Sequence, residues 1–129
     1  MSGLLLDTHV LLWWQADDER LSPAARAAIA DQDQRVFVSA ASAYEIALKA
    51  GRGRLKLPDL ADRWFRRRMR DNGFMVLAIS SAHALAAGVL PLAHRDPFDR
   101  LLIAQAHAES LAVVTADPAF ARYDVETLW

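Results

Sequence analysis

Four acidic residues lie beside short apolar segments that are spread over the whole chain. Asp7 comes directly after three leucines, Glu45 lies shortly beyond the apolar residues 36–38, and Asp117 follows two valines. Asp99 stands at the start of an apolar, helix-like stretch. If the apolar segments are parallel strands, their carboxyl ends meet at one edge of a sheet, which is where open α/β sheets bind ligands. We therefore expect the four carboxylates to converge on one pocket.

Carboxylates gathered in this way repel one another, and this repulsion indicates what chemistry they serve. A like-charge pair at about 4 Å costs roughly 4 kcal/mol at an effective dielectric constant near 20. Mg²⁺ or Mn²⁺ offsets that cost, because these hard cations prefer oxygen ligands. A carboxylate cluster that holds one or two such ions can activate a water and stabilise the leaving oxygen of a phosphodiester. Without metal, some of these carboxyl groups should have raised pKa values, and mild acidification or added metal should stabilise the protein.

Each acid also has a purely structural explanation. The explanations are a strand-end turn for Asp7, helix capping before proline for Asp96 and Asp117, the favourable end of a helix dipole for Asp99, and an i,i+4 ion pair with Lys49 for Glu45. Glu45 is the hardest to dismiss, because it lies within an apolar helix. Taken together, acids at one edge of a predicted sheet favour a shared site over coincidence.

The elements that must position these acids alternate between strands and helices. Strands are predicted over residues 4–6, 36–38, 75–79, 111–115 and 125–128. Helices are predicted from about residue 10 with Thr8 as cap, over 23–30 after Ser22, from Ser39 or Ser42 to a terminal Gly51, and over 59–71, 82–89 and 98–109, with a short turn after Asp117. Short strands that are apolar on both sides indicate an α/β fold with a parallel sheet between helices.

The chain has 129 residues, and we expect a single domain over 1–129. A hydrophobic content of 53% supports a packed core. There is no cysteine, which excludes disulfides and thiolate metal sites, and no apolar run is long enough to span a membrane. The N-terminus lacks the pattern of a signal peptide, so we expect a cytoplasmic protein.

Basic residues concentrate in one segment. Residues 49–70 contain nine Lys or Arg and two Asp, a net charge of +7, whereas the rest of the chain carries −8. Within this segment Arg63, Arg66, Arg67 and Arg70 share one helix face, opposite Leu60, Trp64, Phe65 and Met69. The pattern fits a polyanionic partner such as RNA, or simply a solvated helix face. Arg68 falls near the apolar side, which a solvated face does not explain.

Four segments resemble, in order, the motifs of the PIN domain. They are Leu5-Leu6-Asp7-Thr8, the stretch from Ser39 to Tyr44-Glu45-Ile46, Asp96-Pro97-Phe98-Asp99-Arg100 with the apolar residues after it, and Val114-Thr115-Ala116-Asp117. The Asp-Pro-Phe-Asp-Arg stretch is the most specific of them. More narrowly, the chain is similar to the VapC-type toxins of bacterial toxin–antitoxin pairs.

The resemblance implies a three-layer fold with a parallel five-stranded sheet and a metal-dependent ribonuclease activity. Asp7, Glu45 and Asp99 match the family's essential metal-binding acids, Asp117 matches a fourth, more variable acid, and Thr115 matches a hydroxyl residue that hydrogen-bonds within the site. Thr8 follows the first Asp as in the family, whereas His9 departs from the usual Asn or Ser. Asp96 is an extra acid of the subgroup, either a cap or a supporting group. The implied cofactor is Mg²⁺ or Mn²⁺, and the implied partners are RNA, a small antitoxin and a second copy of the chain.

Other kinds of site find little support. The chain has no His-x-x-x-His zinc spacing, complete phosphate-binding loop or Gly-x-Ser-x-Gly elbow. We interpret His83 and His107 as structural or surface residues, and His94 as a loop residue that lies just before the acidic motif. Four aromatic residues are first predicted to be core residues: Trp13, Trp14, Trp64 and Phe65. The alternative is that a few of them line a dimer or antitoxin groove, because aromatic residues are common interface anchors. A non-catalytic PIN-fold binding module remains an alternative, whereas a phosphatase would need an Asp-x-Asp pattern that is missing here.

Overall fold

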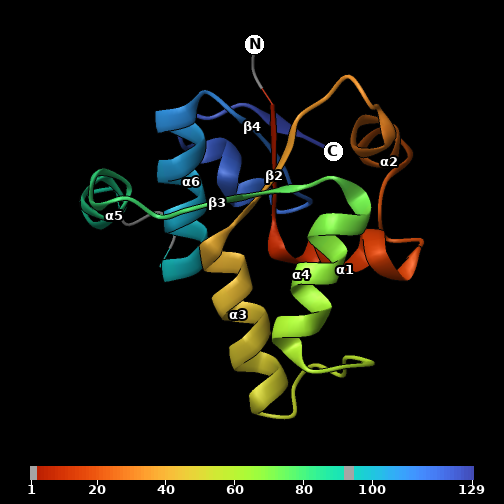
Figure 1. Ribbon diagram of the computed structural model, residues 1–129. Coiled ribbons are helices and arrows are strands. Elements are labelled where there is room, and N and C mark those ends of the chain that lie inside the picture. The colour runs from red at the N-terminus through yellow and green to blue at the C-terminus, as the bar shows by residue number, and fades with distance from the viewer. Residues whose placement is uncertain (1–2, 92–94) are drawn as a thin grey trace.

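The computed structural model describes residues 3–91 and 95–129, so the interpretation of His94 lies outside the described residues. Its centre is a five-stranded sheet in the order β3-β2-β1-β4-β5, in which every pair of neighbours is parallel (Figure 1). The strands are β1 Leu4–Leu6, β2 Val36–Ser39, β3 Met75–Leu77, β4 Ala112–Val114 and β5 Thr127–Leu128. The predicted parallel α/β architecture is confirmed.

Helices alternate with these strands along the chain. They are α1 Thr8–Ala16, α2 Pro23–Ala30, α3 Ala40–Gly51, α4 Ala61–Asn72, α5 Ser81–Gly88 and α6 Pro97–Glu109, with a short 3₁₀ helix, η1, at Pro118–Arg122. Figure 1 shows α6 on one side of the sheet, α1 and α2 on the other, and α3 and α4 extending together below it. None of the described helices is long and apolar enough to cross a lipid bilayer.

The leucines of β1 explain the three layers. Leu4 and Leu6 belong to a core cluster with residues of α1, α2, α3 and α4, whereas Leu5 packs in a second cluster with α6 and η1. Successive side chains of a strand point to opposite faces, so a strand that is covered on both faces must be apolar throughout. β1 therefore lies at the centre of the molecule, and its last residue leads directly to Asp7.

The order of the strands places the end of β1 at a point where the chain changes direction. From β1 the chain builds outward through β2 to β3, and it then crosses back to add β4 on the other side of β1. Crevices open at the carboxyl ends of strands at such switch points, because the connections on the two sides lead away from each other. The acids after β1, β2 and β4 therefore face one crevice.

Side chains that cap helix N-termini set several of the helix starts. Ser22 accepts a hydrogen bond from the backbone N–H of Ala25, and Ser39 accepts one from Ala41. Asp96 accepts hydrogen bonds from the backbone N–H groups of Phe98 and Asp99. These contacts satisfy N–H groups that have no partner within the helix, and they confirm the predicted caps at Ser22 and Asp96.

Several predicted boundaries were wrong. Thr8 does not cap α1 but is its first residue, and Asp7 occupies the cap position without a side-chain cap hydrogen bond. Gly51 ends α3 from inside the helix, and the left-handed conformation falls two residues later, at Gly53. α4 begins at Ala61 rather than at residue 59, and β3 stops at Leu77 rather than at residue 79.

Two predictions of burial were also wrong. Leu60 is 61% exposed, because it precedes α4 instead of forming part of its apolar face. β3 was predicted to be buried on both faces because it is apolar. Met75 and Val76 are instead 41% and 50% exposed. β3 is an edge strand, and the described helices leave part of it uncovered.

Arg100, in the acidic motif, has a structural role. Its buried guanidinium donates hydrogen bonds to the backbone carbonyls of Ala87 (2.8 Å), Leu90 (2.7 Å) and Pro91 (3.0 Å). The carbonyls of Leu90 and Pro91 lie beyond the end of α5, where no helical N–H reaches them, whereas that of Ala87, in the last turn, also accepts from the backbone N–H of Leu90 at 3.4 Å. Arg100 thus ties the end of α5 to the start of α6.

Replacing Arg100 with Met should lower the free energy of unfolding by about 1–3 kcal/mol, because carbonyls that it satisfies would lose their donor. Urea denaturation measures this directly. Arg95→Met, at an exposed position before the same helix, is the matched control and should change stability little. An equal effect of the two substitutions would contradict the role assigned to Arg100.

Candidate active site

A cavity of about 590 Å³ lies at the carboxyl ends of the central strands. Its lining residues are Asp7, His9, Trp13, Arg20, Glu45, Lys49, Asp96, Asp99, Ala116 and Asp117. The structure therefore brings all four acids singled out in the sequence to one cavity, together with Asp96. This arrangement agrees with the prediction that the four acids share a pocket. Their role as metal ligands stays a prediction.

Asp7 is held in place by its backbone and by its side chain. Its backbone N–H donates to the carbonyl of Val114 at 3.0 Å, which joins the end of β1 to β4. Its Oδ2 accepts a hydrogen bond of 2.8 Å from the hydroxyl of Thr115. The same hydroxyl accepts a hydrogen bond from the backbone N–H of Asp117. Thr115 thus links the two acids that follow β1 and β4.

Glu45 lies on the second turn of α3 and is buried. The Nζ of Lys49 donates to its Oε2 at 2.7 Å, so the i,i+4 ion pair expected as a structural explanation is present. The same two side chains also line the cavity, and the structural and functional explanations of Glu45 are therefore compatible. Lys49 supplies a positive charge that offsets the burial of Glu45.

Two buried hydrogen bonds fix the start of α3 against its neighbours. The hydroxyl of Thr8 donates to Oγ of Ser42 at 2.8 Å, which ties the start of α1 to α3. The hydroxyl of Ser39 donates to Oε1 of Gln105, which ties the end of β2 to α6. Thr8 therefore supports the site indirectly, by holding together the helices that follow Asp7 and carry Glu45.

The remaining acids combine a capping role with a place in the cavity. Asp96 caps α6, and Asp117 caps η1 through a 2.9 Å hydrogen bond from the backbone N–H of Ala119. Asp99 lies in the first turn of α6, where the helix dipole favours a negative charge. The capping explanations are thus confirmed for Asp96 and Asp117. In both caps the Oδ1 atom accepts the hydrogen bonds, and both side chains also line the cavity.

Burial is the largest influence on the carboxyl group of Asp7. Loss of hydration raises the pKa of the Asp7 carboxyl group above its ordinary value of 3.8, and repulsion from Glu45 adds to this effect. The hydrogen bond from Thr115 and the nearby His9 act in the opposite direction, but they do not cancel it. Asp7 is therefore poised to bind a positive charge.

The residues of the cavity fit a hard divalent cation by their donor type. Carboxylate oxygens are the preferred ligands of Mg²⁺ and Mn²⁺, and these cations retain several waters, so they do not need a closed cage of protein ligands. Among residues 3–91 and 95–129, however, no three His, Asp or Glu side chains are already arranged to hold a metal ion. The acids share a cavity without forming a finished chelating cluster. The sequence had predicted a tighter grouping than the structure shows.

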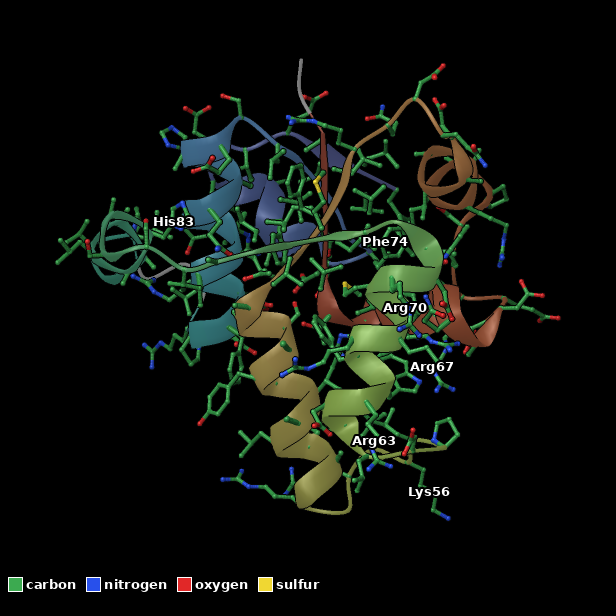
Figure 2. All side chains as sticks on the ribbon, viewed as in Figure 1. Lys56, Arg63, Arg67, Arg70, Phe74 and His83 are labelled. Carbon is green, nitrogen blue, oxygen red and sulfur yellow. The ribbon has the colours of Figure 1, made fainter. Side chains whose placement is uncertain are left out.

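The arginines predicted to bind RNA lie elsewhere. Arg63, Arg66, Arg67 and Arg70 are exposed on α4, and none of them lines the cavity with the acids. Figure 2 shows Arg63, Arg67 and Arg70 spaced along this helix. On the opposite side of α4, Trp64, Phe65 and Met69 are buried as predicted.

Sequence reasoning did not identify Trp13 and Arg20 as residues of the site. Trp13 is only partly buried, and the guanidinium carbon of Arg20 lies 5.1 Å from the centre of its ring. His9, whose role the sequence left open, stacks at a tilt on Trp13 and also lines the cavity. The spacing of His9 and Trp13, four residues apart on α1, was an available signal, whereas nothing in the sequence places Arg20 there.

The raised pKa of Asp7 leads to a prediction about stability. Between 3.8 and the raised value, the folded protein binds more protons than the unfolded chain, so the free energy of unfolding falls as the pH rises through this window. At pH 7 the ionised carboxylate is therefore a net cost in the metal-free protein. Asp7→Asn removes the charge and retains an oxygen that can accept the hydrogen bond of Thr115.

The metal-free Asp7→Asn variant should melt above the unmodified protein at pH 7, by roughly 3–5 °C for each kcal/mol gained. The difference should shrink as the pH is lowered towards 4. Thermal melts in EDTA across this pH range provide the measurement. Asp33→Asn, at an exposed position outside the cavity, is the control. A variant that melts below the unmodified protein at every pH would show that the charge of Asp7 stabilises the fold.

Similarity to known proteins extends over nearly the whole chain. The PIN domain family profile matches residues 4–126. Ribonuclease VapC22 of Mycobacterium tuberculosis is 35% identical over 118 residues, which cover 91% of this chain and 88% of that protein.

Solved structures agree in fold. The VapBC2 complex of Rickettsia felis, bound to a DNA fragment from its promoter, has a chain that matches with a TM-score of 0.70 and 14% identity over 98% of both chains. A toxin–antitoxin complex of Klebsiella pneumoniae matches with a TM-score of 0.63 and 20% identity over 90% of this chain and 88% of that chain. FitAcB of Neisseria gonorrhoeae matches with a TM-score of 0.61 and 23% identity over 96% and 95%. The profile match over nearly the whole chain and the 35% identical relative show that this protein belongs to the PIN-domain family.

Proposed function

We propose that this protein is a VapC-type endoribonuclease, the toxin of a toxin–antitoxin pair. The single observation that carries the proposal is the convergence of Asp7, Glu45, Asp99 and Asp117 on one cavity at the sheet's switch point. The 35% identical relative, a VapC ribonuclease, supports the same function. A non-catalytic PIN-fold module has no need to retain a buried carboxylate with a raised pKa beside a second buried acid.

Asp7, Glu45, Asp99 and Asp117 would hold Mg²⁺ or Mn²⁺. When bound, the ion lowers the pKa of a water and neutralises charge that develops on a phosphate. Thr115 keeps the Asp7 carboxylate oriented through its 2.8 Å hydrogen bond. Thr8 and Ser42 hold α1 and α3 together, so that Asp7 and Glu45 stay on the same side of the cavity.

Lys49 contributes to the site in two ways, by balancing the charge of Glu45 and by contacting the substrate. It balances the charge of Glu45 in the metal-free protein through the 2.7 Å ion pair. A cation that binds Glu45 would compete with this pair and would leave the ammonium group beside the cavity. There it can contact a phosphate oxygen of the substrate by a charge-assisted hydrogen bond.

The exposed arginines of α4 would attract RNA from a distance. Arg63, Arg66, Arg67 and Arg70 lie outside the cavity, so we assign them to long-range attraction and to loose phosphate contacts rather than to the reaction. Such contacts fix no base sequence. We place the activity in the cytoplasm, where the substrate RNA is abundant. A small antitoxin is the proposed inhibitor, because the similar Klebsiella pneumoniae structure is a toxin–antitoxin complex.

Purified protein should cleave RNA in the presence of Mg²⁺ or Mn²⁺, and Asp7→Asn and Glu45→Gln should each reduce the rate at least about 100-fold, which corresponds to about 2.7 kcal/mol in the barrier. A time course of RNA loss gives the rate, and sequencing the 5′ ends of cleaved total RNA gives the cleavage site. Asp33→Asn should cleave like the unmodified protein. Undiminished cleavage by Asp7→Asn would rule out the assigned chemistry.

Calorimetric titration with Mn²⁺ separates the nuclease from a binding module. The unmodified protein should bind the ion and Asp7→Asn should bind it much more weakly, because a ligand is lost. A protein that binds RNA but no Mn²⁺ would support the alternative of a non-catalytic module.

We also propose a homodimer that buries the exposed apolar side chains from β3 to α5. Val76, Leu85 and Val89 are 50%, 73% and 84% exposed, and β3 is an edge strand, which natural proteins usually protect. Light scattering should give a dimer for the unmodified protein and a monomer for Val76→Asp combined with Val89→Asp. A monomer in both cases would contradict this assignment.

A further inference from the structure

A second hollow, of about 530 Å³, lies beside the cavity of the acids, between α1, the end of α3, the connector that follows it and α4. We call it the basic groove. Its lining residues are His9, Leu12, Trp13, Gln15, Ala16, Asp18, Arg20, Lys49, Arg54, Leu55, Lys56, Leu57, Pro58, Trp64 and Arg68. Its Lys and Arg residues outnumber its one acid, Asp18, by five to one. The groove is therefore positive, whereas the adjoining cavity is lined mainly by carboxylates.

The groove and the cavity are continuous. His9, Trp13, Arg20 and Lys49 line both of them. A chain that has one phosphate at the carboxylates can therefore extend into the groove without leaving the protein surface. Trp13 lies at the junction, where it contacts His9 and Trp129 at ring-centre distances of 6.0 and 5.8 Å.

The connector holds its cations in position, and neither of them has an ion-pair partner among the described residues. Leu55 and Leu57 pack against the larger core cluster, so that Arg54 and Lys56, which alternate with them, are exposed. Within residues 3–91 and 95–129, neither Arg54 nor Lys56 forms an ion pair. Figure 2 shows Lys56 below the start of α4, beyond Arg63, the first of the labelled arginines of that helix. Two charges are thus presented by an anchored backbone.

Nitrogen donors deeper in the groove also lack acceptors. The Nε of Arg68 and the Nε2 of Gln15 are buried and have no hydrogen-bond partner among the described residues. Among the described residues, the one ion pair of Arg68 is a long contact of 3.4 Å between its Nη2 and Oδ2 of Asp71. Unsatisfied donors are costly, and phosphate, ribose and base oxygens are acceptors that would satisfy them after a small side-chain adjustment. Arg68, which departs from the exposed arginine face of α4, is thus one of the residues that line the groove.

We propose that the basic groove holds the single-stranded RNA segment next to the phosphate that is cleaved. Arg54, Lys56 and Arg68 contact its phosphates, and Trp13 provides a surface for a base at the junction. Grooves for single-stranded nucleic acids combine cations along the backbone with aromatic rings that stack bases, and both features are present here. An acidic protein segment would also match the charge, but the continuity with the acid cavity favours the substrate. The proposal rests on the proposed ribonuclease function and adds to it the location of the bound strand.

The test compares two double variants that remove the same number of charges. R54A/K56A removes the connector cations, and R63A/R67A removes two arginines from the exposed face of α4. Both are made in the Asp7→Asn background, which prevents cleavage, and binding of a fluorescein-labelled 12-nucleotide oligouridylate is measured by anisotropy in EDTA over a range of salt concentrations.

R54A/K56A should weaken binding at least 10-fold more than R63A/R67A does, and it should reduce the salt slope by about 1.4, the value for two phosphate contacts of a single strand. Arg68→Gln should weaken binding further in combination. A photoactivatable 4-thiouridine in the RNA should crosslink to the peptide that contains Arg54 and Lys56. Equal losses of affinity for the two double variants would indicate diffuse attraction only and would overturn the proposal. The absence of RNA binding, or an unchanged affinity of R54A/K56A, would also overturn it and would leave the groove to a protein partner.

The proposal and the underlying function can fail separately. Cleavage of total RNA by the unmodified protein with Mg²⁺ or Mn²⁺ tests the function. If cleavage occurs but binding does not depend on Arg54 and Lys56, the groove is wrong and the nuclease stands. If no RNA is cleaved but binding depends on these two residues and the crosslink forms, the groove is right and the enzymatic function fails.

Discussion

The pairing of β1 with both β2 and β4 is the constraint on which the rest of the structure depends. Parallel strands in register end together, so the residues that follow them are forced to the same edge of the sheet. Asp7 follows the central strand, and its backbone is tied to β4 through Val114. The fold therefore imposes proximity on acids that would otherwise separate in water, and every other feature of the site compensates for that repulsion or uses it.

The compensation is incomplete. Thr115 and His9 lower the pKa of Asp7 and Lys49 pairs with Glu45, yet burial and repulsion still prevail at Asp7. Charged groups kept in such an unfavourable state are typical of functional sites, where stability is given up for reactivity. The hydroxyl pair Thr8–Ser42 and the buried amide of Gln105 keep the surrounding helices fixed, so that the repulsion is not relieved by movement of the backbone.

Opposite charges lie in adjoining hollows of the surface. The acid cavity suits a cation, whereas the basic groove beside it suits a polyanion, and Trp13 and Lys49 belong to both. This arrangement suits a nuclease, in which the metal and the substrate backbone need neighbouring sites of opposite sign. It also divides the basic segment of the sequence into two parts, because Arg68 turns towards the groove while Arg63 and Arg67 face outward.

The sequence by itself determined the parallel α/β architecture, the caps at Ser22 and Asp96, the buried face of α4 and the sharing of one pocket by the four acids. These features follow from local rules: apolar runs, capping chemistry and helical periodicity act over a few residues. Helix and strand ends were less predictable, because contacts between distant elements affect them. Thr8, for example, does not cap α1 but donates a hydrogen bond to Ser42 of another helix.

Apart from Lys49, whose ion pair with Glu45 follows from helical spacing, only the tertiary structure decided which cations lie near the acids. Arg20 and Arg54 reach neighbouring hollows through the packing of α1 and the connector, and no periodic pattern encodes that meeting. The exposure of β3 was likewise decided by its place at the sheet edge. Charge interactions between distant segments depend on how the whole chain packs. The hydrophobic pattern that forms a helix or strand, in contrast, lies within the residues of that element.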